Sequence, residues 1–367
     1  MKKIGILTFH KVPNYGAVLQ ALALKEYLQK VSGGEVSVLD FQCPGNSDDF
    51  FPQKYFDDFC ASKKILKKVA KKILVYMFAQ KAYKKKYEKF NKFREQYLNV
   101  IPYTTQIYDD LDFIFCGSDQ IWNTDITKGF KPQYFGANKP TGSNTVIASY
   151  AASCGDISEF SNEKKRCLFE IIQNLDQISV REKTLAETLM EAEIDAVQVM
   201  DPTFLLNKEN YFEIFNYDNE KPIVFQYELQ KDPVLDKISQ KIAMEKGLDI
   251  VKVCGYPRLS NEKGLFDIGP TEFMQLFLSA KYVVTNSFHG TALSLILEKD
   301  FNSVLPKSRR GRITDLLNLI DLSNRICHDE NNVNTEPINY KIVTPVLKKQ
   351  INFSMAYIER VLNERKG

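Results

Sequence analysis

The chain holds three histidines, and His289 lies in the segment whose residue types are best suited to chemistry. The polar turn Asn286-Ser287-Phe288-His289-Gly290-Thr291 follows the apolar residues 282–284 and precedes a second apolar run. A neutral imidazole can give or take a proton near pH 7, whereas the charged ring pairs with an anion. Because a helix N-terminus after a parallel strand presents free N–H groups, this turn predicts an anion site containing a titratable group. The alternative is a histidine packed at a strand end and satisfied by a backbone carbonyl.

Cations follow this turn along the chain. Residues 307–312 include Lys307, Arg309, Arg310 and Arg312, on an expected loop that leads into a helix. A guanidinium group donates two parallel hydrogen bonds to phosphate or carboxylate oxygens. Arg312 is the strongest candidate because it adjoins the apolar side chains of that helix, which would hold it in place. A solvated basic loop is the alternative for some of the other cations.

Another polar turn follows the first expected strand. Residues 9–20 contain Asn14, Tyr15 and Gln20 and open a helix. The position is that of a nucleotide-binding turn, but the repeated glycines are missing, so a phosphate loop of the Gly-rich kind is weakly supported. These three side chains could instead contact a sugar through hydrogen bonds and ring stacking. An N-terminal helix cap with Tyr15 packed beneath it is the alternative.

The single tryptophan lies in a third such turn, at residues 116–123. Asp119 could orient a hydroxyl or act as a base, and Trp122 could form a platform for a sugar ring. A buried tryptophan that anchors a loop explains the pattern equally well. Two later polar sites, Arg181-Glu182 and Asp201, are interpreted as structural pairing and capping.

These turns need a scaffold that brings them together. Apolar, β-branched runs alternate with helical patterns, which predicts an α/β fold with largely parallel sheets. The runs fall into two series, 4–9, 36–41, 113–116, 145–150, 178–180 and 197–200, then 223–227, 250–253, 282–285 and 303–305. A chain of 367 residues is long for one core, so we expect two domains. We place them at residues 1–215 and 216–344, with a closing helix at 345–367.

A basic helical insertion is expected near residues 61–97. Lysines dominate this stretch, while apolar residues recur at helical intervals. The favoured interpretation is a solvated lysine face over a packed apolar stripe. The alternative is a basic amphipathic element attracted to anionic lipid.

Composition limits the function classes. A net charge of +3 is too small an excess to indicate nucleic-acid binding. No run approaches the ~20 apolar residues of a membrane span, and the first residues are interpreted as a strand rather than a signal peptide. The seven dispersed cysteines are typical of reduced thiols in the cytoplasm. Separated histidines and the lack of clustered carboxylates predict no metal site.

In combination, these motifs resemble the polysaccharide pyruvyl transferase family. The matching stretches occur in a consistent order: Asn14-Tyr15-Gly16-Ala17 with Gln20, Gly117-Ser118-Asp119-Gln120-Ile121-Trp122, Ser179-Val180-Arg181-Glu182, Asp201-Pro202-Thr203-Phe204-Leu205-Leu206, Asn286-Ser287-Phe288-His289-Gly290-Thr291, and Arg312-Ile313 with Leu316-Leu317. The resemblance implies two Rossmann-like domains facing a cleft, as in GT-B glycosyltransferases. It also implies an enzyme that transfers pyruvate from phosphoenolpyruvate to a hexose of an exopolysaccharide or capsule, or to a lipid-linked precursor, forming a pyruvate ketal without a further cofactor.

The resemblance also gives the candidate residues roles. His289 would transfer a proton or contact phosphate, and Arg312 would hold the anionic groups of the donor. The other donor-binding candidates, expected in the C-terminal domain, are Asn286, Ser287, Gly290, Thr291, Lys307 and Arg310. Asp119 would be the base for a sugar hydroxyl. The other acceptor-binding candidates, expected in the N-terminal domain, are Asn14, Tyr15, Gln20, Ser118, Gln120 and Trp122.

The sequence also suggests a cellular location and two alternative functions. We expect a cytoplasmic protein. Because a lipid-linked acceptor would lie at the inner membrane surface, we also expect at most peripheral, salt-sensitive membrane contact through the basic stretch. One alternative is a GT-B-type glycosyltransferase, since the same fold would place basic groups on the diphosphate of a nucleotide sugar. The other is a non-catalytic glycan-binding or assembly protein.

Overall fold

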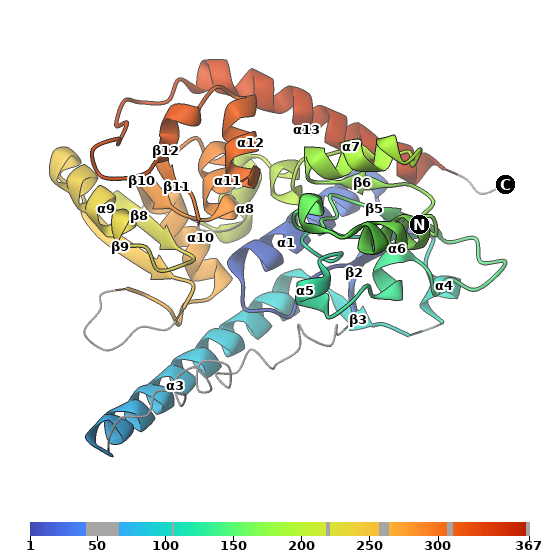
Figure 1. Ribbon diagram of the computed structural model, residues 1–367, viewed down its shortest axis with the longest axis horizontal. Helices are drawn as coiled ribbons and strands as arrows, with labels where there is room; N and C mark the ends of the chain where they lie inside the picture. The colour runs from blue at the N-terminus through green and yellow to red at the C-terminus, as the bar shows by residue number, and fades with distance from the viewer. Residues whose placement is uncertain (42–65, 105, 218–220, 257–263, 307–310, 365–367) are drawn as a thin grey trace.

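The computed structural model describes residues 1–41, 66–104, 106–217, 221–256, 264–306 and 311–364, with side chains of the long helix from residue 79 onward. Figure 1 shows two α/β halves joined by helices. The helices are α1 (Tyr15–Ser32), α3 (Leu66–Tyr97), α4 (Ile107–Asp110), α5 (Thr124–Thr127), α6 (Asn162–Ile172), α7 (Lys183–Glu191), α8 (Lys208–Phe215), α9 (Pro233–Lys246), α10 (Pro270–Ser279), α11 (Phe288–Ile296), α12 (Gly311–Leu319) and α13 (Tyr340–Asn363).

The first sheet has five parallel strands in the order β3-β2-β1-β4-β5. They are β1 (Lys3–Leu7), β2 (Glu35–Asp40), β3 (Val100–Pro102), β4 (Phe113–Cys116) and β5 (Val146–Ser149). The central strands are buried on both faces, which explains their continuous apolar runs. A small parallel pair, β6 (Ser179–Val180) with β7 (Val197–Gln198), continues this sheet through single bridges to the segment after β5.

The second sheet repeats the plan with the order β12-β11-β10-β8-β9, again entirely parallel. Its strands are β8 (Ile223–Glu228), β9 (Asp249–Cys254), β10 (Ala280–Thr285), β11 (Asp300–Val304) and β12 (Ile326–Cys327). The predicted α/β class with two Rossmann-like parallel sheets is therefore confirmed. The proposed boundary at residue 216 falls between the last strand of the first half and β8.

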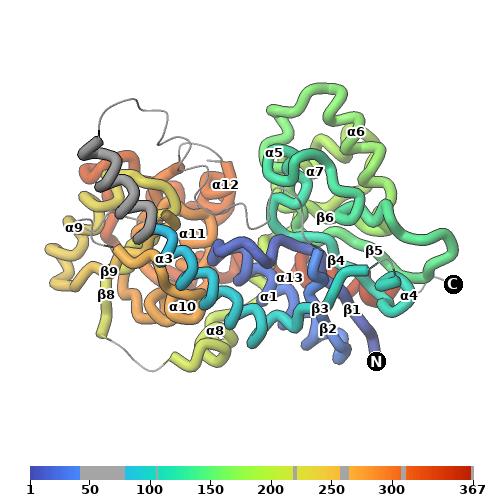
Figure 2. Tube along the Cα trace, turned by 90° about the horizontal axis from the view of Figure 1, so that it is seen from below, coloured from blue at the N-terminus to red at the C-terminus, as the bar shows by residue number. Residues whose placement is uncertain are grey.

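Helix α1 lies at the junction between the halves (Figure 2). Asn14 caps its start by accepting a hydrogen bond from the Ala17 N–H, and Gly33 ends it at a φ of 60°. The Tyr15 ring stacks on Phe273 of α10 at 4.2 Å, and its hydroxyl donates to the Ile268 carbonyl. One apolar core therefore extends across the junction.

Helix α3 is one continuous helix whose C-terminal part packs against the second half. The Lys85 ammonium lies 2.6 Å from the Asp267 carboxylate, and Lys89 pairs with Glu272 at the start of α10. Lys86 is buried beneath these pairs. In the part of α3 whose side chains are described, these contacts favour the packed interpretation of the basic stretch.

Helix α13 crosses both halves (Figure 1). Near its start, the Tyr340 hydroxyl donates to the Lys299 carbonyl of the second half. Near its end, the Tyr357 hydroxyl donates to the Ser149 carbonyl at the end of β5, so the chain finishes on the first half. Among the described helices, none combines the length and the hydropathy needed to cross a bilayer.

Candidate functional site

His289 lies in the first turn of α11, directly after β10. Ser287 is the N-cap of this helix, and its side chain accepts a hydrogen bond from the Gly290 N–H. The imidazole ring faces Gly16 in the first turn of α1, so closely that a methyl group added at Gly16 would overlap the ring. The turns that follow β1 and β10 therefore meet across the junction, as expected where the carboxyl ends of two parallel sheets face each other.

Asp201 lies on the other side of the imidazole. Its Oδ2 atom is 3.6 Å from His289 Nε2, an ion-pair distance beyond that of a hydrogen bond. The other oxygen, Oδ1, accepts hydrogen bonds from the backbone N–H and the hydroxyl of Thr203. Burial alone would raise the pKa of Asp201, but His289 and Arg181 outweigh it and hold this pKa well below its ordinary value. The imidazole therefore faces a fixed carboxylate that is ionised at neutral pH.

Arg181 connects this carboxylate to two others. Its guanidinium lies 3.1 Å from Asp201, 3.2 Å from Glu182 and 4.0 Å from Asp119. Burial lowers the pKa of Arg181, but the three carboxylates raise it further, so the net pKa is above the ordinary value. A buried charge requires such partners. We refer to His289, Asp201, Arg181, Glu182 and Asp119 as the charged cluster.

Three buried polar atoms of the charged cluster have no hydrogen-bond partner among the described residues. They are Nη2 of Arg181, Oε2 of Glu182 and Nε2 of His289. The second Glu182 oxygen is occupied, since it accepts hydrogen bonds from the Ser153 hydroxyl and Arg181 Nε. Unpaired buried polar atoms are rare in folded proteins. Two potential donors and one acceptor in one buried cluster are the groups that a small polar ligand would need.

The predicted donor-binding residues next to His289 are occupied in structural contacts. The Asn286 amide binds the turn after β8, accepting from the Leu229 N–H and donating to the Gln230 carbonyl. Thr291 donates to the Ser287 carbonyl and bonds the Ser303 hydroxyl. A side chain at Gly290 would overlap Thr285. These contacts fix α11 on its sheet and thereby aim His289.

Arg312 is brought to the same turn, and it lies at the start of α12. Its guanidinium is 5.2 Å from the centre of the Phe288 ring, and the Arg181 guanidinium is 5.6 Å from the same ring. Cations are attracted to the face of an aromatic ring. Phe288 therefore places a second cation beside the charged cluster. The candidates Lys307 and Arg310 lie outside the described residues.

Most predicted acceptor residues are occupied in packing and capping. Asn14 caps α1 and Tyr15 stacks on Phe273. The Gln20 amide donates to the Thr8 hydroxyl and the Ala17 carbonyl. Trp122 has 0% exposure, stacks on Phe135 and donates to the Tyr134 carbonyl. These contacts favour the capping and loop-anchoring alternatives, because a fully buried ring has no face for a sugar.

Asp119 keeps a partly exposed side chain, unlike its neighbours. Ser118 and Gln120 are buried, and the Gln120 amide oxygen accepts a hydrogen bond from the Asn123 amide. Asp119 is 18% exposed and has a φ of 70°, a conformation that Asp tolerates better than most side chains. One of its oxygens accepts from the Gln120 N–H and faces Arg181. Of the predicted acceptor residues, Asp119 is the one that belongs to the charged cluster.

Gly16, Arg181, Glu182 and Asp201 were absent from the predicted site. The sequence places Arg181, Glu182 and Asp201 at strand ends, where local pattern predicts structural pairing and capping. The useful signal was the number of charged or polar residues placed directly after strands. That these residues gather around the turn of His289 follows only from the three-dimensional structure.

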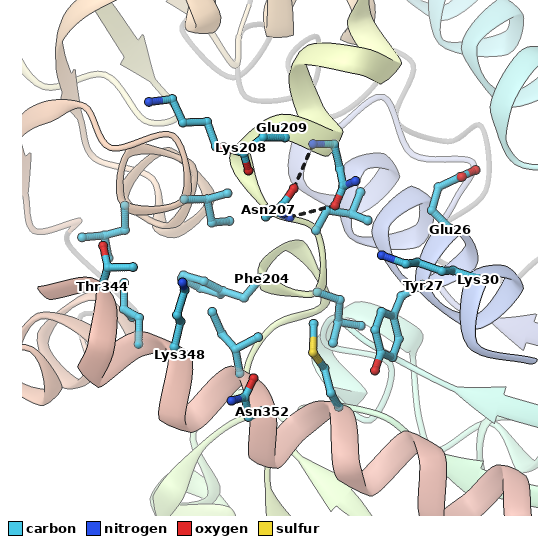
Figure 3. Close-up of a pocket in the computed structure, with 18 of the residues that line it drawn as sticks. Glu26, Tyr27, Lys30, Phe204, Asn207, Lys208, Glu209, Thr344, Lys348 and Asn352 are labelled. Atoms are coloured by element: carbon cyan, nitrogen blue, oxygen red, sulfur yellow. Dashed lines mark hydrogen bonds between the residues drawn. The ribbon is translucent and has the colours of Figure 1, made fainter. Parts of the chain in front are cut away.

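A separate pocket of about 740 Å³ lies away from the charged cluster. It is lined by residues of α1, α8, α11 and α13, among them Tyr27, Lys208, Leu295 and Lys348, and by Phe204 of the 3-10 turn Pro202–Leu205 (Figure 3). None of the residues predicted from sequence lines it. His289 occupies the first turn of α11, whereas the far end of the same helix lines this pocket.

Comparison with solved structures finds proteins of low identity. The UDP-GlcNAc 2-epimerase of Methanocaldococcus jannaschii is 13% identical over 100% of this chain and 94% of that chain, with a TM-score of 0.44. The UDP-GlcNAc 2-epimerase of Neisseria meningitidis bound to UDP-GlcNAc is 10% identical over 99% and 94%, with a TM-score of 0.43. The heptosyltransferase WaaC of E. coli is 11% identical over 95% and 99%, with a TM-score of 0.38. At such scores these likenesses carry no argument about activity, and no curated protein matches the chain.

A protein-family comparison is more decisive. The model of the polysaccharide pyruvyl transferase family matches residues 14–306. That span is most of the chain and contains Gly16 and every member of the charged cluster. The resemblance drawn from the motifs is confirmed, and with it the expectation of a transferase enzyme. The chain belongs to the polysaccharide pyruvyl transferase family.

Proposed function

We propose that this transferase moves the pyruvyl group of phosphoenolpyruvate onto two hydroxyls of a hexose, forming a ketal. Family membership implies a polysaccharide acceptor. The acceptor is proposed to be a hexose of a surface polysaccharide or of its lipid-linked precursor. The observation that carries the proposal is the imidazole of His289, 13% exposed and 3.6 Å from the fixed Asp201 carboxylate. The neighbouring Phe288 ring holds the guanidinium groups of Arg181 and Arg312 on the same turn.

Ketal formation defines what the site must supply. The methylene carbon of the donor gains a proton and becomes a methyl group. Two sugar oxygens form bonds to the central carbon, the bond from that carbon to the phosphate oxygen breaks, and both hydroxyl protons leave. The reaction therefore needs a proton donor, a proton acceptor, and cations for the carboxylate and phosphate of the donor.

His289 is proposed as the group that protonates the methylene carbon. The Asp201 carboxylate lies 3.6 Å from Nε2, at ion-pair distance from the imidazole. Gly16 of the first half lies so close to the imidazole that the ring has no room to turn. Asp201 is thus a positioning residue, and its role matches that of carboxylates that orient a catalytic histidine.

The anionic groups of the donor are proposed to meet Arg312 and Nη2 of Arg181, which lies 4.0 Å from Asp119 but makes no hydrogen bond to a described residue. Guanidinium donors suit both carboxylate and phosphate oxygens. Asp119 is proposed as the base that accepts a hydroxyl proton, because it is the partly exposed carboxylate of the charged cluster. Glu182 has one buried oxygen, Oε2, without a hydrogen-bond partner among the described residues, and this oxygen could bind a second hydroxyl.

Mass spectrometry of candidate lipid-linked oligosaccharides, incubated with enzyme and phosphoenolpyruvate, tests the proposal. We expect a mass gain equal to one pyruvyl ketal, together with release of inorganic phosphate, and loss of both with His289→Ala or Arg312→Ala. Near-normal turnover of both variants would refute the assigned roles. Heat protection by a nucleotide sugar and not by phosphoenolpyruvate would instead favour the glycosyltransferase alternative.

A further inference from the structure

We propose that the outer face of α13 docks onto an anionic lipid bilayer. Three large apolar side chains on this helix are exposed: Ile342 by 68%, Val346 by 39% and Phe353 by 50%. Their spacings of four and seven residues place them in one row along the helix. Lys349 falls in the same row by the same spacing, so a basic residue lies among the apolar ones along a single exposed line.

The charge of this face is positive. Residues 340–358 contain no Asp or Glu, while Lys341, Lys348 and Lys349 are all exposed. No ion pair joins these three lysines to another residue of the part that the structure describes. A helix that inserts apolar side chains among lipid headgroups and surrounds them with Lys or Arg binds anionic membranes in this manner.

The position of α13 suits a docking element. It crosses both halves of the molecule along one side (Figure 1), so a bilayer lying against its outer face would contact both halves through one helix. The described part of α3 is less suited to this role, because Lys85 and Lys89 pair with Asp267 and Glu272 of the second half.

A second copy of the chain fits this face less well. In a two-fold antiparallel pair, the centre of the row from Ile342 to Phe353 would lie on the symmetry axis. Lys349 lies in the row near that centre, so the Lys349 side chains of the two copies would face each other. Such like charges repel, and lysine is depleted from the buried centre of protein interfaces.

Co-sedimentation of the full chain with vesicles tests the inference. The vesicles contain phosphatidylcholine alone or phosphatidylcholine mixed with phosphatidylglycerol. We expect binding to the anionic vesicles that weakens at high salt, and little binding to the neutral ones. The variants Ile342→Ser/Phe353→Ser and Lys341→Glu/Lys349→Glu should each lower the partition constant by about tenfold or more.

The matched control is Met244→Ser on α9, where the methionine is 84% exposed but lies outside the row. It should leave vesicle binding unchanged, and thermal unfolding should show that all variants stay folded.

Three vesicle results would overturn the inference: equal binding of the α13 variants and the parent, equal binding to neutral vesicles, or no vesicle binding at all. So would light scattering that shows a dimer which Ile342→Ser/Phe353→Ser dissociates. Because no residue of the charged cluster is changed, this test is independent of the proposed reaction.

Discussion

At the scale of single residues, the lack of a side chain at Gly16 lets α1 lie directly against the imidazole of His289. The imidazole ring occupies the space that a side chain at this position would need. Asp201 then holds the ring from the other side, with its second oxygen fixed by Thr203. The orientation of His289 is therefore set by a missing side chain and a buried carboxylate together.

Gly16→Ala should lower activity with a small effect on folding. The added methyl group pushes the imidazole away, and catalytic groups displaced by about 1 Å lose up to a hundredfold in rate. We expect kcat to fall by at least about tenfold. The control is Gly311→Ala, because a methyl group there would meet no atom nearer than Asp315 Oδ2 at 3.9 Å. Equal kcat for both variants would show that the Gly16 contact is not needed for orientation.

Asp201→Asn should lower kcat by about a hundredfold with a smaller change in KM, because it removes the charge that stabilises the imidazolium. It should also destabilise the fold by about 3 kcal/mol, since Arg181 loses a buried partner. Thr203→Val is the matched control, since it removes one hydrogen bond to Asp201 but keeps the charge. A kcat loss in Thr203→Val as large as that in Asp201→Asn would point to general disorder of the site.

The sequence predicted the strand-end turns but not their partners. His289, Asp119 and Arg312 were chosen from local pattern, and all three lie at the junction. Tyr15 and Trp122 were harder, because an aromatic residue after a strand has the same local pattern whether its ring is exposed or packed. Arg181 and Asp201 gained their place beside His289 from chain segments far apart in sequence, which periodicity alone does not bring together.

At the scale of elements, most strands were predictable because their buried runs are continuous and β-branched. The short edge strands β3 and β12 were not predicted. Helix α3 was predictable as a helix, but the sequence pattern does not distinguish the lysines that form ion pairs from the lysine that is buried. Lys85 and Lys89 form ion pairs, whereas Lys86 is 2% exposed and lies against the rings of Tyr15 and Phe266 at 4.6 and 4.5 Å. Burial lowers the pKa of Lys86 to about 7.

Lys86→Met should stabilise the protein, most strongly at low pH. The folded-state pKa of Lys86, about 7, lies below the value of about 10.4 in an unfolded chain. Between these values the unfolded chain binds the extra proton, so the penalty for burying Lys86 shrinks as the pH rises. Below pH 7 the penalty is full, and the gain from Lys86→Met should reach up to about 4 kcal/mol.

Urea unfolding at pH 6 and pH 9 measures this dependence. The gain from Lys86→Met should be clearly smaller at pH 9 than at pH 6. Lys84→Met on the exposed side of the same helix is the control and should change stability by less than about 0.5 kcal/mol at both pH values. A gain that does not vary with pH would mean that the Lys86 ammonium is not desolvated as described.

At the scale of the whole molecule, the two sheets share an apolar core at their junction, next to the charged cluster. Phe273 of the second half stacks on Tyr15 of the first and also packs against Tyr227 at 4.9 Å. Each sheet has its own strands and covering helices, as a separate domain would. The aromatic contacts at the junction are therefore what should make the halves unfold together.

We expect the wild-type protein to unfold in one transition, and Phe273→Ala to separate it into two. Trp122 is the single tryptophan and lies in the first half, so its fluorescence reports that half, whereas far-ultraviolet circular dichroism reports the whole chain. The two urea midpoints should coincide in the wild type. Removing the Phe273 ring costs about 4 kcal/mol, and this loss destabilises the second half and the junction. The dichroism change should therefore begin at a lower urea concentration than the fluorescence change.

Leu235→Ala is the control. Leu235 is buried in a core cluster of the second half alone, so its loss should lower both midpoints together. Coincident midpoints in Phe273→Ala would place the coupling of the halves elsewhere, with α13 as the next connection to test.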